Sequence, residues 1–124
     1  MHGGEIAVQA ALHPSGNWIT LPLTVGGLLH LDMVLDTGSP VSVISPKARD
    51  DLLGRQLLDP STEGIRYRLA QLSVHEQPLP PLMVRVLPRL TRLQVDGLLG
   101  LDFLRLFEHV HFHVPTLQLV LELP

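Results

Sequence analysis

The stretch VLDTGSPVSVI, residues 34–44, decides how this chain of 124 residues is interpreted. It places a carboxylate, Asp36, at a glycine-bearing turn between two strongly apolar segments with β-strand character. Carboxyl groups that are partly desolvated in this way carry out acid/base hydrolysis without a metal or cofactor. The tripeptide Asp36-Thr37-Gly38 occurs once in the chain. Asp36 is therefore the first candidate for a catalytic residue, and an Asx-type turn cap is its structural alternative.

Composition narrows the classes of protein to consider. The length suits a single domain over residues 1–124, large enough for its own core but with stability to gain from oligomerisation. Hydrophobic residues make up 45% of the chain, so we expect part of the apolar surface to be buried against a partner. The net charge of −3 and the scattered arginines argue against a nucleic-acid partner. The lack of cysteine excludes a disulfide framework and a thiolate metal site.

No apolar run approaches the roughly 20 residues that span a bilayer, and no signal peptide is recognisable after residues 1–4. We therefore expect a soluble segment that makes no membrane contact. The compartment stays open, and so does the alternative that the segment belongs to a longer, even membrane-anchored, protein.

The hydrophobic pattern is mostly that of β-strands. Gly26-Gly27 suits a two-residue hairpin turn, because both positions tolerate positive φ. Ser45-Pro46 predicts the start of a short helix and Gly54 its end, and a second helix is expected from Leu101 to about Glu108. Strands are expected over residues 5–12, 17–25, 28–35, 41–45, 65–74, 82–87, 96–100, 109–114 and 117–123.

Three elements, taken in order, resemble the retropepsin-like aspartic proteases. The first is LPLTVGG at residues 21–27, and the second is LDTGS at residues 35–39 with its following apolar strand. The third is GLLGLDFL at residues 97–104, which is similar to the family's hydrophobic-hydrophobic-glycine element and the helix after it. The resemblance covers roughly residues 17–123. It implies a mostly β, closed acid-protease barrel with a flap hairpin, one or two short helices and one lobe per chain.

A single Asp-Thr-Gly implies the retroviral arrangement, because two-lobed relatives carry two copies in one chain. The resemblance thus implies a homodimeric aspartic endopeptidase in which one Asp36 from each subunit activates water and cleaves a peptide or protein substrate without a cofactor. The alternative is a non-catalytic or weakly catalytic dimerisation or binding module that retains the fold. A processing domain, active only within a larger precursor, is a further alternative.

The residues after Asp36 are expected to support the active-site loop. Thr37 resembles the family threonine that locks the two loops across the dimer axis, and the Gly38 amide is expected to bond to Asp36. Ser39 resembles the serine of pepsin-type sites, and its hydroxyl is expected to bond the outer carboxylate oxygen of Asp36. Pro40-Val41 stands where retroviral enzymes carry acidic residues near the substrate, so we expect a more apolar pocket.

The flap is expected over roughly residues 57–67. It has one glycine instead of a glycine-rich tip, which puts its mobility and substrate contact in doubt. Tyr67 fits a core-facing strand residue better than a flap tyrosine. The candidates for the flap tip are Thr62, Glu63, Gly64 and Ile65.

Strictly alternating leucines near the C-terminus are the candidates for a dimer interface. They resemble the terminal strands that interleave between subunits in this family, and an exposed edge strand this apolar would aggregate. These residues are Leu117, Leu119, Leu121 and Leu123.

His109, His111 and His113 share one strand face at a period of two. A metal site is one interpretation, but no acidic or cysteine cluster accompanies them, so we prefer a solvated strand face and expect no metal. Near a dimer interface, their protonation would weaken the dimer at low pH. Asp102 is interpreted as a charge at a helix N-terminus and Trp18 as a packing residue.

Overall fold

The computed structural model describes residues 4–60 and 66–124, so the flap-tip candidates Thr62, Glu63, Gly64 and Ile65 lie outside the described residues. Within those two segments, no helix has the length and apolar character needed to cross a membrane. The strands are β1 (Glu5–Gln9), β2 (Ala11–Leu12), β3 (Ile19–Val25), β4 (Leu29–Leu35), β5 (Ser42–Ile44), β6 (Asp59–Pro60), β7 (Tyr67–Leu69), β8 (Leu72–Val74), β9 (Gln77–Pro78), β10 (Leu82–Val86), β11 (Gly97–Leu99), β12 (His109–His113) and β13 (Gln118–Glu122). The helices are α1 (Pro46–Gly54) and α2 (Leu101–Leu104), with 3-10 turns η1 (Pro88–Leu93) and η2 (Val114–Thr116).

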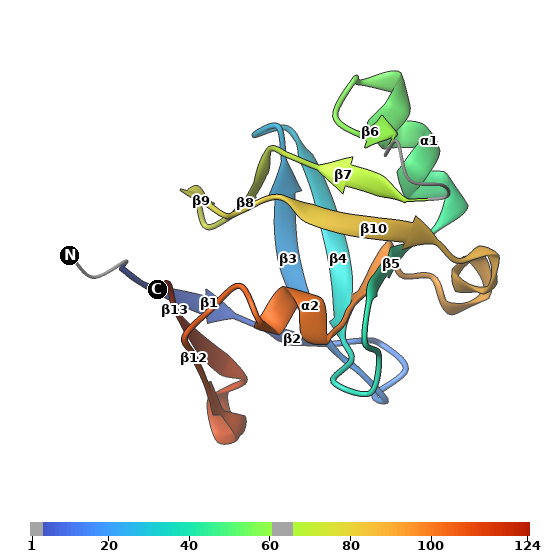
Figure 1. Ribbon diagram of the computed structural model, residues 1–124. Coiled ribbons are helices and arrows are strands. Elements are labelled where there is room, and N and C mark those ends of the chain that lie inside the picture. The colour runs from blue at the N-terminus through green and yellow to red at the C-terminus, as the bar shows by residue number, and fades with distance from the viewer. Residues whose placement is uncertain (1–3, 61–65) are drawn as a thin grey trace.

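The larger sheet curls strongly around its core. Its strand order is β6-β7-β10-β5-β11-β4-β3-β8-β9, with β2 paired to β3. β7 and β8 lie near opposite ends of this order, yet only residues 70–71 separate them in the chain. Because three Cα steps span at most about 11 Å, the two ends of the sheet must come together, as Figure 1 shows. The strand expected over residues 65–74 is therefore two short strands with a bend between them, which corrects that prediction.

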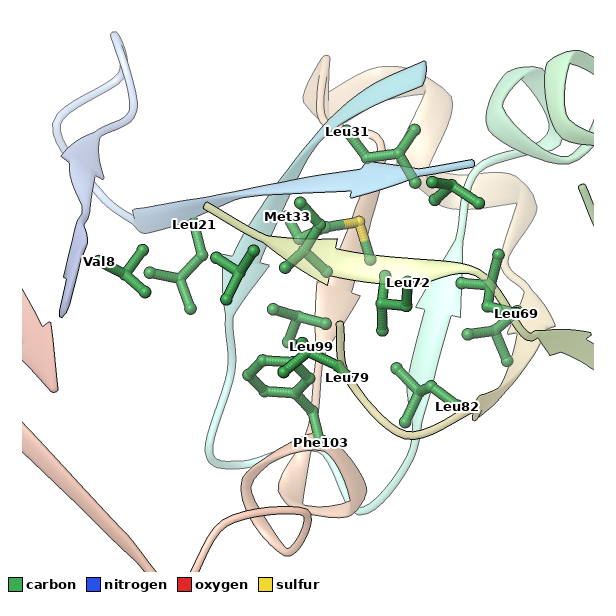
Figure 2. Packing of buried hydrophobic residues seen from close by; sticks show 14 of the residues in the cluster. Val8, Leu21, Leu31, Met33, Leu69, Leu72, Leu79, Leu82, Leu99 and Phe103 are labelled. Atoms are coloured by element: carbon green, nitrogen blue, oxygen red, sulfur yellow. The ribbon is translucent and has the colours of Figure 1, made fainter. Parts of the chain in front are cut away.

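The inside of the curled sheet is filled by aliphatic side chains and one phenylalanine. Alternation along β3 and β4 turns every second residue inward, so Leu21, Leu31 and Met33 are at most 3% exposed. Figure 2 shows these side chains meeting Leu99 of β11 and Phe103 of α2 in one cluster. β11 and α2, which come late in the chain, are thereby anchored against the early hairpin β3–β4.

The hairpin between β3 and β4 uses the predicted glycines. Gly26 and Gly27 have φ of 62° and 70°, a region that L side chains rarely adopt. Val25 pairs with Leu29, so the loop has three residues, one more than expected, and Leu28 belongs to it.

Helix α1 begins as predicted and ends later than predicted. The Ser45 hydroxyl accepts a hydrogen bond from the Ala48 amide at 3.1 Å, with Pro46 at the first helical position. Gly54 is still helical, and Gln56 instead takes the left-handed φ of 58°. The second helix, in contrast, is shorter than expected, because α2 ends at Leu104.

The smaller sheet has the order β1-β13-β12, which corrects the expectation of an apolar edge strand at the C-terminus. β13 lies in the middle because β1 pairs with it from Glu5–Glu122 to Gln9–Gln118. Leu119 and Leu121 are 0% exposed within the single chain, in the same core cluster as the barrel leucines. Leu117 and Leu123 pack partly against that cluster. The leucine face therefore covers the chain's own core, and the edges of this sheet are β1 and β12.

Candidate active site

Asp36 begins the loop that joins β4 to β5, and β11 runs between these two strands. β11 pairs in parallel with β4, Leu99 opposite Leu35, and antiparallel with β5, Leu98 opposite Val43. The loop is bonded to the end of β11 on both sides. The Asp36 amide donates to the Leu99 carbonyl at 2.9 Å, and the Leu101 amide donates to the Ser39 carbonyl at 2.8 Å.

The Asp36 carboxylate has one oxygen held by the loop. The Gly38 amide donates to Oδ1 at 3.0 Å, which is the contact expected from the sequence. Among the described residues, no group donates a hydrogen bond to Oδ2. Asp36 is half-buried, whereas Thr37 and Gly38 are exposed at the surface of the loop. Oδ2 is thus available to a water molecule or to a group outside this chain.

Gly100 lets the loop sit directly on the end of β11. A Cβ at this position would lie 2.5 Å from the Ser39 carbonyl oxygen and 2.8 Å from the Val41 carbonyl oxygen. Its φ of −96° suits any residue, so glycine is needed here for close packing and not for conformation. Gly97 is equally confined, because a Cβ there would collide with the Val43 carbonyl and the Met33 side chain. These two contacts explain why glycines flank the two leucines of the third motif.

Asp102 fixes the base of the loop. Its Oδ2 accepts from the Ser42 amide at 2.9 Å, and its Oδ1 accepts from the Ser42 hydroxyl at 2.6 Å and the Phe103 amide at 2.8 Å. The Ser42 hydroxyl in turn accepts from the Gly100 amide at 3.0 Å. Asp102 therefore ties α2 to β5, beyond the helix-terminal role expected from the sequence. The sequence signal for this contact was Ser42 itself, because a serine within an apolar run needs a polar partner such as Asp102 when it is buried.

Ser39 supports the loop in a different way from the one expected. Its hydroxyl donates to the Val41 carbonyl at 2.7 Å, two residues along the loop. The expectation that this hydroxyl donates to the outer oxygen of Asp36 is wrong, because a hydroxyl has one proton to give and Val41 receives it.

An apolar hollow of about 230 Å³ lies beside Asp36. Trp18 lines it, half-buried and with its ring tilted against that of His13 at 5.1 Å between centroids. The remaining lining is aliphatic, from Val34, Leu35, Leu93 and Leu98. Trp18 was expected only to pack, so its place beside the carboxylate is a site feature that sequence reasoning missed.

The histidines of β12 lie on an exposed face away from the core. His109, His111 and His113 are all exposed, and the His111 Nε2 lies 3.6 Å from a carboxylate oxygen of Glu122 on β13. Within residues 4–60 and 66–124, no three histidine, aspartate or glutamate side chains are gathered so that they could hold a metal ion.

Comparison by sequence gives no relationship: no family model matches the chain, and neither does any curated protein. Comparison by structure does. The chain is similar to a retropepsin-like aspartic protease from Rickettsia conorii, with a TM-score of 0.63, 17% identity, and coverage of 97% of this chain and 90% of that one. It is also similar to the retroviral protease-like domain of Ddi1 from Leishmania major, with a TM-score of 0.57, 15% identity, and coverage of 87% and 94%. The fold is therefore retropepsin-like, which confirms the resemblance inferred from the three motifs at the level of architecture.

Proposed function

We propose that this chain is an aspartic endopeptidase that acts as a homodimer, with Asp36 of each subunit forming the catalytic pair. The observation that carries the proposal is the set of hydrogen bonds that hold the backbone and the carboxylate of Asp36. Its backbone is fixed on the end of β11, one carboxylate oxygen is held by the Gly38 amide, and Oδ2 has no donor among the described residues.

The chemistry follows from two carboxyl groups brought together across a two-fold axis. Two carboxylates at close range repel one another, so the pair shares one proton. The ionised group takes a proton from water, whose oxygen then bonds to the scissile carbonyl carbon. The protonated group gives its proton to the carbonyl oxygen, which leaves it ionised and the other group protonated. In the collapse of the tetrahedral intermediate, the newly protonated group gives its proton to the amide nitrogen and the newly ionised group takes a hydroxyl proton, so the C–N bond breaks and the amine and the carboxylic acid are released. Either subunit takes either role.

The second subunit is required because the chain has one Asp-Thr-Gly. Thr37, next to Asp36, is exposed in the single chain and so is available to contact its counterpart across the axis. A two-fold arrangement repeats the same surface on both subunits. The hollow beside Asp36, lined by Trp18 and aliphatic residues, suits an apolar substrate side chain next to the scissile bond.

The alternative is a dimerisation or binding module that keeps the fold without turnover. It is favoured by the expected flap segment, residues 57–67, which has one glycine where a mobile tip would have several. A binding module, however, has no use for a carboxylate held as Asp36 is.

One experiment separates the two. The protein is incubated with a diverse peptide library from acidic to neutral pH, and cleavage is read by mass spectrometry. Asp36→Asn preserves the shape of the side chain and should abolish cleavage, as should a pepstatin-like inhibitor. Asp32→Asn is the matched control, because Asp32 is an exposed carboxylate on β4, the strand that leads into Asp36. A dimer verified by sedimentation that cleaves nothing would favour the binding module.

A further inference from the structure

A second hollow, of about 280 Å³, borders the end of the active-site loop. Val41 and Ser42 line it, and Val41 is tied into the Asp36 loop by the hydrogen bond from Ser39. Two cationic side chains, Arg66 and Arg85, line it as well. This hollow is separate from the apolar one beside Asp36, since the two share no lining residue.

The Nε of Arg85 is buried and has no hydrogen-bond partner among the described residues. A buried donor left unsatisfied costs on the order of 1–3 kcal/mol, and more when the group is charged. Because this atom is closed to solvent, a ligand in the hollow would reach it only after the Arg85 side chain rotates, and that rotation would let the ligand satisfy the donor. Arg85 lies on β10 opposite Val43 of β5, so the strand that carries it is hydrogen-bonded to the strand leaving the active-site loop.

The register of β7 and β10 places Arg66, the residue just before β7, opposite Arg85. β10 and β7 pair from Leu82–Leu69 to Val84–Tyr67, and continuing this register by one residue places Arg85 opposite Arg66. Like charges directly opposite one another on neighbouring strands are unfavourable. Two guanidinium groups in that arrangement form a site that an anion would stabilise.

The acidic residue of the same hollow does not neutralise the arginines. Both oxygens of Asp102 already accept hydrogen bonds, from the Ser42 amide and hydroxyl and from the Phe103 amide. Within residues 4–60 and 66–124, neither arginine forms an ion pair with an aspartate or glutamate. The charged lining of two arginines and one aspartate is therefore net positive.

We propose that this hollow is a substrate subsite that binds a carboxylate side chain of the peptide, so that the protein prefers an acidic residue near the scissile bond. Guanidinium groups bind planar carboxylates through paired hydrogen bonds, and the Arg85 Nε can be one of the donors once the side chain rotates toward the hollow. A peptide is favoured over a small free anion because Val41 belongs both to this hollow and to the loop that starts at Asp36. The inference rests on the proposed function, and its test is designed to fail separately from it.

The first arm of the test measures kcat/KM on peptide pairs that differ only in glutamate or glutamine, scanned across the positions around the cleaved bond. At one position glutamate should be favoured by about 10-fold, the equivalent of one charge-assisted hydrogen bond. Arg85→Gln should reduce that preference to about 2-fold or less, mainly through KM, with Arg85→Lys in between. Arg89→Gln is the control, because Arg89 is exposed and lines neither hollow. Equal use of glutamate and glutamine at every position would overturn the proposal.

The second arm requires no turnover. The Arg85 Nε–Hε resonance, assigned with Arg85→Lys, is followed by NMR in the Asp36→Asn protein during titration with the glutamate peptide, the glutamine peptide or inorganic phosphate. A saturable shift with the glutamate peptide alone supports the subsite even if no peptide is ever cleaved. A shift with phosphate as large as with the glutamate peptide would make this a site for small anions and overturn the proposal. So would the lack of any shift with the glutamate peptide.

Discussion

Replacing Gly100 by alanine tests the central claim about the active-site loop. The new methyl group would start 2.5 Å from the Ser39 carbonyl oxygen and 2.8 Å from the Val41 carbonyl oxygen. Both are backbone atoms, so no side-chain rotation relieves the contact. Ordinary van der Waals contact begins at 3.4 Å, so the Ser39 carbonyl must retreat by roughly 0.9 Å.

The cost follows from this displacement. Overpacking of one methyl group costs about 1–3 kcal/mol, and loss of the Leu101–Ser39 hydrogen bond adds about 1 kcal/mol. We therefore expect Gly100→Ala to lower the free energy of unfolding by about 2–4 kcal/mol. For a chain of this length the midpoint of thermal unfolding should fall by roughly 8–16 °C. A shift of the loop by nearly 1 Å should also lower kcat/KM by about 100-fold in protein that remains folded.

Thermal unfolding by circular dichroism is the assay, at one fixed protein concentration because the proposed dimer would make stability depend on concentration. Gly54→Ala is the matched control. Gly54 is exposed in α1 with nothing near its would-be Cβ, so alanine there should stabilise by about 0.5–1 kcal/mol. A Gly100→Ala protein that melts at the same temperature as the wild type and keeps the proposed peptidase activity unchanged would refute the conclusion that β11 supports the Asp36 loop by direct contact.

Other substitutions probe the remaining parts of the structure. Leu119→Ala should lower the free energy of unfolding by about 2–5 kcal/mol in urea titrations, because this side chain is fully buried in the single chain; a small effect on stability with loss of the proposed dimer would instead support a role for Leu119 in the interface. Asp102→Asn should cost about 2 kcal/mol by weakening its charge-assisted hydrogen bonds, whereas Asp51→Asn on the exposed side of α1 should change stability little. Arg85→Met should raise stability by about 1 kcal/mol in buffer without added anions, since it removes a buried donor that lacks a partner; a clear loss in calorimetry would show that the donor is satisfied in the folded chain.

The turns, the start of the first helix and the family motifs could be predicted from the sequence, because each depends on residues close together in the chain. Glycine adopts positive φ without strain, so Gly26-Gly27 could be assigned to a tight turn. Ser45-Pro46 combines a capping hydroxyl with a proline that suits the first helical position, so it could be assigned to a helix start. The Asp36 loop and the Leu98-Leu99-Gly100 segment were both recognised as parts of the retropepsin-like pattern, and the structure brings them together through β11. In each case the deciding interaction involves the residue's own backbone or a motif with fixed spacing.

The features that the sequence did not predict depend on pairing between strands that are far apart in the chain. The alternating leucines of β13 indicated an apolar face but not what that face packs against. The strand that pairs with β13 is β1, which lies more than a hundred residues earlier in the chain. The break between β7 and β8 is set by closure of the sheet and leaves no mark in the hydrophobic pattern. The Asp102–Ser42 bonds and the buried Nε of Arg85 depend on strands that the sequence alone does not align.

The insertion of β11 between β4 and β5 has a consequence for how the protein is made. The strands on either side of Asp36 leave the ribosome early, but the segment that holds their loop in place ends about 65 residues later, at Leu101. At about 5–20 residues per second, translation takes roughly 3–13 seconds to cover that interval. During this time the carboxylate has no defined setting, so a nascent chain cannot present an assembled site until Leu101 has been added.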